Sequence, residues 1–211
     1  MDTNTLNQTS YLKIIVGPMF SGKTTALLKI YQECLLSNIS VSIINHEMDK
    51  RYHETLMTSH NNIQAPCIQT KYLKNVWNTN DEIDLSKLNN ISSFLNYKKL
   101  FYSDVILINE AQFFPDLFEV VIDMLKKNKK IYICGLDSDF ERKKFGQIFD
   151  LIPFCNDIEK LKAKCSFCSD NENNNAVFSM RLTKEKEQMI IGNDIYKPVC
   201  RICYENHNKT L

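Results

Sequence analysis

The sequence predicts an α/β fold, in which a parallel sheet is flanked by helices and followed by a small C-terminal metal-binding domain. Short apolar runs rich in β-branched residues alternate with segments of helical periodicity. The first of these runs leads through a glycine-containing loop into a helical segment. From about residue 163 the alternation stops and two cysteine pairs follow, so we place the domain boundary between residues 1–162 and 163–211.

The composition is that of an ordinary globular protein, with 44% hydrophobic and 24% charged residues in a chain of 211. A net charge of +1 argues against a surface devoted to nucleic acid. No apolar stretch approaches the roughly 18 residues needed to cross a membrane. The first residues lack the basic and apolar regions of a signal peptide. We therefore expect a cytoplasmic protein.

The first part of the chain is expected to form strand, loop, helix and strand in that order. Residues 11–16 are too short and too β-branched for a helix, and residues 40–44 resemble a second buried strand. Between them, apolar residues recur at helical spacing: Leu27, Ile30, Tyr31, Cys34 and Leu35. Residues 45–62 are polar and predict a loop that carries Asp49, Arg51 and His60. Residues 71–99 show no clear period.

The next part repeats the alternation. Residues 105–108 and 131–134 predict two further buried strands, the second ended by Gly135. An amphipathic helix is expected after Pro115 and Asp116, with these residues facing inward: Phe118, Val121, Ile122 and Leu125. Strands that alternate with helices in this way predict a parallel sheet with right-handed crossovers.

A phosphate-binding loop is predicted where the first strand meets the first helix. Gly17, four residues, and then Gly22-Lys23-Thr24 form the pattern of the P-loop NTPases, and the flanking strand and helix supply the required context. The glycines let backbone N–H groups turn toward a phosphate, and the helix N-terminus adds positive charge. Lys23 would reach the β- and γ-phosphates, and the Thr24 hydroxyl would bind Mg²⁺. The context disfavours an ordinary glycine turn, so we expect a nucleoside triphosphate here.

A candidate general base follows the strand at residues 105–108, which runs directly into Asn109 and Glu110. Ligands of open α/β sheets bind beyond the carboxyl ends of the strands, and a carboxylate there can accept a proton. Taken alone, Glu110 would more often be a surface residue at a strand-to-loop junction. The phosphate loop favours the catalytic interpretation.

The eight cysteines fall into two groups. Two pairs with identical spacing are separated by 31 residues: Cys165 and Cys168, then Cys200 and Cys203. In a reducing compartment four such thiolates predict a closed tetrahedral zinc site with a structural role, rather than four unliganded core cysteines. His207 lies nearby, is surplus to this set and is expected in solvent. The other four are expected to be small buried hydrophobes: Cys34, Cys67, Cys134 and Cys155.

Several short motifs, in their order along the chain, resemble those of the type II thymidine kinases, the cytosolic zinc-containing deoxynucleoside kinases. The resemblance extends from about residue 12 to residue 204 and is weak at residues 68–100. The motifs are GPMFSGKT at 17–24, DKRY at 49–52, TSH at 58–60, NEAQFF at 109–114, LDSDFERKKFG at 136–146, KEKE at 184–187, GNDIY at 192–196 and CRICY at 200–204.

The resemblance implies that the γ-phosphoryl group of ATP is transferred to the 5′-hydroxyl of thymidine, with Glu110 as the base and Mg²⁺ and structural Zn²⁺ as cofactors. The residues implied for ATP and phosphate are Gly17, Pro18, Met19, Phe20, Ser21, Gly22, Lys23, Thr24, Asp49, Arg51, Asn109 and Gln112. Those implied for the thymine pocket are Met19, Phe113, Leu136, Phe140, Phe145 and Tyr196. Aromatic rings suit a flat base, and methionine adapts around a methyl group. Without the motifs, these apolar residues would be read as core, where we also expect Phe114 and Phe149.

The resemblance further implies a lid, a homotetramer and feedback inhibition by thymidine triphosphate. The lid would lie between Cys168 and Cys200, close over the nucleoside and bind its base largely through main-chain atoms. The chain departs from the family pattern at three positions: Asn109 replaces an aspartate, Asn61 follows His60 where an acid is common, and Ile191 precedes Gly192 in place of a second glycine. These departures are expected to affect the metal contact, the rate and the nucleoside preference, but not the reaction class.

Two other functions fit part of the pattern. One is an ATP-dependent zinc-ribbon factor that binds nucleic acid, against which the near-zero net charge argues. The other is a kinase with a broader range of deoxynucleosides. The sequence does not decide between a narrow and a broad substrate range.

Overall fold

The computed structural model describes residues 9–49, 56–58, 63–77, 91–169, 174–190, 192 and 194–209. Four residues that the sequence singles out lie outside these ranges: Arg51, His60, Asn61 and Ile191. The phosphate loop, the strand end at Glu110 and the four paired cysteines all lie inside them. Within the described ranges, no helix is long and apolar enough to cross a membrane.

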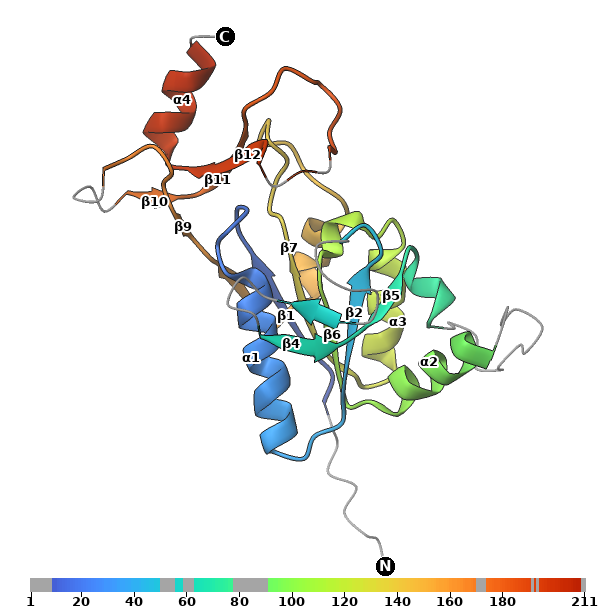
Figure 1. The fold of residues 1–211 in the computed structure, drawn as a ribbon. Coiled ribbons are helices and arrows are strands. Elements are labelled where there is room, and N and C mark those ends of the chain that lie inside the picture. The colour runs from blue at the N-terminus through green and yellow to red at the C-terminus, as the bar shows by residue number, and fades with distance from the viewer. Residues whose placement is uncertain are drawn as a thin grey trace, which may run out of the picture.

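A six-stranded parallel sheet forms the centre of the molecule (Figure 1). Its strands run in the order β5-β2-β6-β7-β1-β8, and each neighbouring pair is parallel. Their bounds are β1 Tyr11–Val16, β2 Val41–His46, β5 Ile68–Thr70, β6 Val105–Ile108, β7 Lys130–Gly135 and β8 Asp157–Lys160. The four predicted buried strands are confirmed. Because the strands are parallel, the carboxyl ends of β1, β2, β6 and β7 lie at one edge of the sheet.

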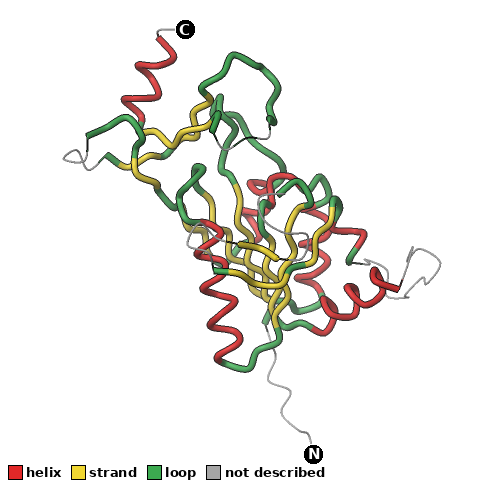
Figure 2. The backbone as a smooth tube through the Cα atoms, viewed as in Figure 1, coloured by secondary structure: helices red, strands yellow, loops and turns green. Residues whose placement is uncertain are grey.

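Helices cover both faces of the sheet (Figures 1 and 2), with α1 (Lys23–Leu36) on one face and α3 (Leu117–Lys126) on the other. The side chains of β1 alternate between them. Ile14 packs in the core cluster that contains the apolar residues of α3, whereas Ile15 packs in the cluster that contains Leu27 of α1. Because both faces are buried, the central strands are continuous apolar runs.

Both helices bury faces that differ slightly from the predicted ones. In α3 the buried residues are Leu117, Val120, Val121 and Met124. The predicted inward residues Phe118, Ile122 and Leu125 pack only at the margin of this core. The buried face of α3 begins at Leu117, the first residue of the helix and one residue before the predicted start. The buried apolar stripe is therefore rotated by about 100° around the helix axis relative to the prediction. In α1, Leu28 is buried instead of Leu35, which lies one residue from the helix end and is 52% exposed.

The region between residues 45 and 102 contains more secondary structure than the sequence predicts. β3 (Leu56–Thr58) and β4 (Gln64–Pro66) form an antiparallel pair, so the prediction of a loop through residue 62 is wrong for residues 56–58. A short 3₁₀ turn, η1 (Leu73–Asn75), and the helix α2 (Ile91–Tyr102) fall where no period was found.

Trp77 explains part of the missing periodicity. It is 1% exposed, and its Nε1 donates a hydrogen bond to Asp123 Oδ2 at 2.7 Å. Its ring lies 6.4 Å from the Tyr97 ring and 6.3 Å from the Phe101 ring, both on α2. In this region, isolated large side chains such as Trp77 are buried in the core. Isolated buried residues produce no periodic pattern of apolar residues in the sequence.

The C-terminal part has a core of its own, although the division into two domains remains a prediction. After the 3₁₀ helix η4 (Ile148–Phe154) and β8, the chain forms β9 Ala163–Lys164, β10 Asn175–Ala176, β11 Phe178–Arg181, β12 Tyr196–Val199 and α4 Arg201–Lys209. These elements surround a third apolar cluster that includes Phe178, Val199 and Tyr204.

None of the four cysteines outside the paired motif forms a disulfide, and they differ in how deeply they are buried. Cys34 and Cys134 are buried, as predicted, whereas Cys67 and Cys155 are only half-buried. Burial raises the pKa of the Cys67 thiol to about 11, which keeps it protonated at neutral pH.

Candidate active site

The predicted phosphate loop joins β1 to α1 at the carboxyl edge of the sheet. Gly22, at the N-cap of α1, has φ of 85°, a left-handed conformation that glycine adopts without a steric penalty. Its carbonyl accepts the first helical hydrogen bond, from Ala26 N at 2.9 Å. The first turn of α1 carries no acidic residue. The N-terminus of α1 therefore offers an uncompensated positive dipole to an anion.

The ammonium group of Lys23 lies over this loop. Its Nζ is 2.6 Å from Pro18 O and 3.5 Å from Ser21 Oγ. Contacts with loop oxygens hold the cation beside the helix N-terminus, where phosphate oxygens would replace some of them. This arrangement is suited to a phosphate chain.

A cavity of about 330 Å³ opens between the phosphate loop, the carboxyl ends of β6 and β7 and the C-terminal part of the chain. Predicted site residues that line it are Met19, Phe20, Ser21, Gly22, Lys23, Thr24, Asp49, Glu110, Gln112, Phe113, Leu136, Phe140, Phe145 and Tyr196. Of the predicted residues that the structure describes, three are not among the lining: Gly17, Pro18 and Asn109. Lining residues outside the predicted sets are Thr25, Met48, Ser138, Asp139, Ser179, Gln188, Met189, Ile190 and Gly192.

Glu110 is held at the floor of the cavity by Gln112. It follows β6 with φ of 51° and ψ of 41°, at the start of the 3₁₀ turn η3 (Ala111–Phe113). Gln112 Nε2 donates to Glu110 Oε2 at 2.7 Å, and Gln112 Oε1 accepts from Leu136 N at 3.0 Å. Gln112 thus connects the ends of β6 and β7 and fixes the direction of the carboxylate. An oriented carboxylate in such a place can accept a proton from a bound hydroxyl.

Asn109 lies behind this floor, in a buried chain of hydrogen bonds. Its Nδ2 donates to Asn45 Oδ1 at 2.8 Å, and its Oδ1 accepts from Cys134 Sγ at 2.9 Å. Asn45 Nδ2 is 3.3 Å from Asp49 Oδ2. Asn109 therefore reaches the cavity through Asn45 and Asp49 and not through its own side chain.

Aromatic rings form the other end of the cavity. The Phe113 and Phe145 rings meet edge to face, with centroids 5.6 Å apart. Tyr196 is 8% exposed, and its hydroxyl accepts from Arg181 Nη2 at 2.6 Å and donates to Ile190 O at 3.2 Å. With its hydroxyl bonded in this way, Tyr196 presents its ring to the cavity. Such a cage suits a flat heterocycle.

Two other phenylalanines were expected in the core. Phe114 is fully buried, as predicted, and its ring packs 4.8 Å from the ring of His46. Phe149 is only half-buried, so that prediction holds in part. The fully buried positions in this turn of η4 belong to Ile148 and Leu151 instead.

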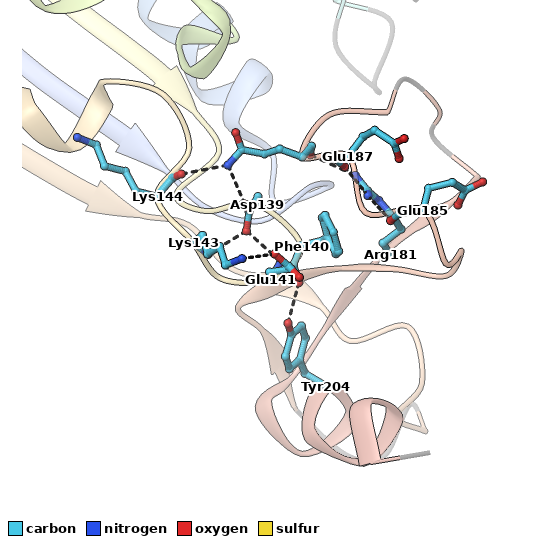
Figure 3. Close-up of polar contacts among 10 residues, drawn as sticks. Asp139, Phe140, Glu141, Lys143, Lys144, Arg181, Glu185, Glu187 and Tyr204 are labelled. Carbon is cyan, nitrogen blue, oxygen red and sulfur yellow. Dashed lines mark hydrogen bonds and ion pairs between the residues drawn. The ribbon is translucent and has the colours of Figure 1, made fainter. Parts of the chain in front are cut away.

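Arg181 organises the segment that covers the aromatic end, residues 182–190, which we call the lid segment (Figure 3). The residue is 4% exposed, and its guanidinium lies 3.6 Å from the centroid of the Phe140 ring. Nη1 donates to Glu185 O at 2.9 Å and to Glu187 O at 2.6 Å, and Nη2 donates to Gln188 O at 3.1 Å. Backbone carbonyls of the lid segment thus satisfy a buried cation.

Ser179 joins the phosphate loop to the C-terminal part. Its Oγ accepts a hydrogen bond from Met19 N at 2.8 Å, across 160 residues of sequence. The prediction missed Ser179, since it lies inside the family resemblance but in none of the quoted motifs. Asp139 and Gly192 lie inside quoted motifs, which was the signal available for them.

The four paired cysteines converge as predicted. Their sulfur atoms all lie within 4.8 Å of one another, and none forms a disulfide. Burial raises the pKa of Cys165, but N–H donors, including that of Cys200 at 3.2 Å, outweigh it and lower that pKa to about 6. Four clustered thiols, one already inclined to ionise, fit a tetrahedral zinc ion. His207, expected in solvent, is half-buried and is not part of the cluster.

Comparisons with known proteins point to one family. A family model described as thymidine kinase matches residues 10–204. A thymidine kinase of Oryza sativa subsp. japonica is 36% identical over 196 residues, which is 92% of this chain and 65% of the rice protein. A thymidine kinase of Sheeppox virus is 35% identical over 195 residues, which is 92% of this chain and 96% of the viral protein. The chain thus spans just under two thirds of the rice relative and nearly all of the viral one.

Proposed function

The chain belongs to the thymidine kinase family, and from this premise we propose that its cavity transfers the γ-phosphoryl group of ATP to the 5′-hydroxyl of thymidine. The products are thymidine monophosphate and ADP, as in nucleotide salvage for DNA synthesis. One observation carries the proposal: a single cavity wall combines the phosphate loop, the Glu110 carboxylate and an aromatic cage. A triphosphate and a nucleoside bound there would meet at the carboxylate.

Glu110 is the general base in this proposal. The oriented carboxylate accepts the proton of the 5′-hydroxyl while that oxygen attacks the γ-phosphorus and ADP leaves. Gln112 keeps the carboxylate in place through its hydrogen bond to Oε2. In this proposal Glu110 accepts the proton, and Gln112 orients the Glu110 carboxylate.

Positive groups and oxygen donors handle the phosphate charge. The phosphate loop and the N-terminus of α1 would hold the ATP phosphates, with Lys23 at the β- and γ-phosphates. Thr24 and Asp49 both line the cavity and offer the oxygen ligands that Mg²⁺ prefers. When bound, Mg²⁺ neutralises charge on the phosphate oxygens. Arg51 is assigned to the same task by the resemblance alone.

The C-terminal part has two tasks in this proposal. Zinc held by the four cysteines stabilises it, and the lid segment covers the nucleoside. The resemblance adds a cytoplasmic setting, a homotetramer and inhibition by thymidine triphosphate, which we include as family-based expectations.

The test is phosphorylation of the four deoxynucleosides, measured side by side with the full chain, ATP and Mg²⁺. We expect kcat/KM for thymidine to exceed that for each of the other three at least tenfold. Comparable values for several nucleosides would instead indicate a broad-range kinase. Absence of phosphorylation together with DNA-stimulated ATP hydrolysis would support the nucleic-acid factor, whose DNA affinity should fall steeply with salt.

A further inference from the structure

A side-chain hydrogen bond joins the lid segment to the loop that follows β7 (Figure 3). Gln188 Nε2 lies 2.8 Å from Asp139 Oδ2 and 3.3 Å from Lys144 O, and Figure 3 draws these contacts as dashed lines that end at the labelled Asp139 and Lys144. Gln188 is exposed at its outer side and also lines the cavity, next to Met189 and Ile190. The bond therefore connects the part of the cavity wall formed by the lid segment to the loop that follows β7 of the sheet.

Asp139 is fixed independently of Gln188. Its Oδ1 accepts hydrogen bonds from Glu141 N at 2.9 Å and from Lys143 N at 2.8 Å, and the residue is 5% exposed. Its own N–H donates to Lys143 O at 3.0 Å. Oδ2 is thereby held in one position for the Gln188 amide. A hydrogen bond to an ionised, already ordered acceptor is stronger than one between two mobile neutral groups.

Anchors of two kinds hold the lid segment. Arg181, buried at the end of β11, donates to the backbone carbonyls of Glu185, Glu187 and Gln188. The second anchor is the Gln188 side chain, which contacts the loop after β7 at Asp139 Oδ2 and Lys144 O. The Gln188 side chain can leave Asp139 Oδ2 and Lys144 O while Arg181 keeps its bond to Gln188 O, so the side-chain contacts can open without unfolding the C-terminal part.

We propose that Gln188 is a positioning residue whose bond to Asp139 latches the lid segment over the nucleoside. This inference rests on the proposed function of the cavity. The latch holds Met189 against the aromatic end, in addition to the bond from the Tyr196 hydroxyl that holds Ile190 O, so it should control how firmly the nucleoside is retained and leave the phosphate loop unaffected. Its opening and closing would accompany nucleoside exchange in each catalytic cycle.

The first test is Gln188→Ala. We expect KM for thymidine to rise about three- to tenfold, as befits one exposed hydrogen bond to a charged group, while KM for ATP and kcat change less than twofold. Lys186→Ala is the matched control, because Lys186 is exposed in the same lid segment and does not line the cavity. An unchanged thymidine KM in Gln188→Ala would overturn the latch.

The second test reverses the polarity of the bond. Gln188→Glu places two carboxylates together and should raise the thymidine KM more than Gln188→Ala does. Adding Asp139→Asn to Gln188→Glu lets the amide at position 139 donate to the carboxylate at position 188, while its oxygen still accepts the two N–H groups of the loop. We expect the double variant to recover at least half of the lost affinity. Failure of this rescue would mean that the two side chains do not act as a pair.

A readout without catalysis separates the latch from the proposed function. Hydrogen exchange of peptides spanning residues 182–190 is measured with and without thymidine. In the wild type thymidine should slow exchange there, and Gln188→Ala should need about three- to tenfold more thymidine for the same protection. Protection at equal thymidine concentration in both proteins would overturn the latch. A wild type that neither phosphorylates nor binds thymidine would instead overturn the proposed function.

Discussion

Asn109 donates a hydrogen bond from Nδ2 to Asn45 Oδ1 across 2.8 Å, and thereby joins the carboxyl ends of the neighbouring strands β6 and β2. Both residues are 1% exposed. The chain of donors runs in one direction, from the Cys134 thiol through the two amides to the Asp49 carboxylate. Every amide group in it meets a complementary partner, so the departure from the family's aspartate is accommodated by a neutral pair.

Asn109→Asp should therefore destabilise the protein at neutral pH, by about 1–3 kcal/mol. The new carboxylate would face the Asn45 carbonyl, and Asn45 cannot turn without facing its oxygen to Asp49. Burial would raise the folded-state pKa of this carboxyl above its unfolded value. The loss should then be absent at low pH, appear as pH rises through the unfolded pKa, and be complete above the folded pKa. Urea unfolding from pH 4 to pH 8 measures this profile.

Asn75→Asp, at an exposed position of η1 with ordinary backbone angles, is the control for that series and should change stability by less than about 0.5 kcal/mol. Equal stability of Asn109→Asp and the wild type at pH 8 would contradict the neutral-pair account. Because Asn109 does not line the cavity, we also expect the Mg²⁺ concentration for half-maximal activity to stay unchanged. A lower requirement would show that position 109 does reach the metal, as the family pattern implies.

Glu110→Gln should lower kcat by about 10²- to 10⁴-fold, because the amide keeps the shape of the side chain but cannot accept the proton. The Gln112 amide can still donate to the new carbonyl oxygen, so the local structure should persist. Thymidine and ATP affinities, measured by calorimetry, should stay within about threefold of the wild type. A variant that keeps more than about a tenth of the wild-type kcat would exclude Glu110 as the base.

Gly146→Ala should lower both stability and kcat. Gly146 has φ of 64°, and a Cβ there would lie 2.3 Å from Gln112 O. Gln112 orients Glu110, so displacement of its backbone should disturb the base as well as the fold. We expect a loss of about 1–3 kcal/mol in the free energy of unfolding and a kcat lowered at least threefold. Denaturant unfolding and steady-state kinetics test the two effects. Gly192→Ala, where the nearest neighbour is the flexible Ile195 side chain, is the comparison for stability only, because Gly192 lines the cavity.

The parts of the fold that the sequence predicted are those with local signatures. The phosphate loop, the strand that leads to Glu110 and the cysteine pairs each lie within a few consecutive residues, so their spacing alone was enough to predict them. The central strands were predictable because both of their faces are buried, which leaves unbroken apolar runs. The position of the α3 stripe was missed by one residue because a short helix with apolar flanks fits two registers.

The missed features depend on residues far apart in the sequence. Gln188 and Asp139 are 49 residues apart, and Met19 and Ser179 are 160 apart, so no local pattern announces either contact. The helix α2 was not predicted because, among the described residues of that region, only Trp77 and a few isolated ones are buried, so the sequence shows no helical periodicity there. Polar residues whose contacts join distant parts of the sequence could therefore be identified only from the structure. Polar residues that belong to a local motif could be identified from the sequence.

Loss of the proposed zinc ion should loosen the C-terminal part. We expect elemental analysis to find about one zinc per chain, and Cys200→Ser to reduce that content severalfold, because a closed site needs all four thiolates. The third apolar cluster is built around these cysteines, so the variant should lose at least about 3 kcal/mol of unfolding free energy and exchange amide hydrogens faster in residues 174–204. Cys155→Ser is the control, since Cys155 is half-buried and packs against the core cluster that contains the apolar residues of α3 and not in the third cluster, and it should retain the zinc. A wild type that contains no transition metal and is equally stable in strong chelator would show that the four thiols are structural without an ion.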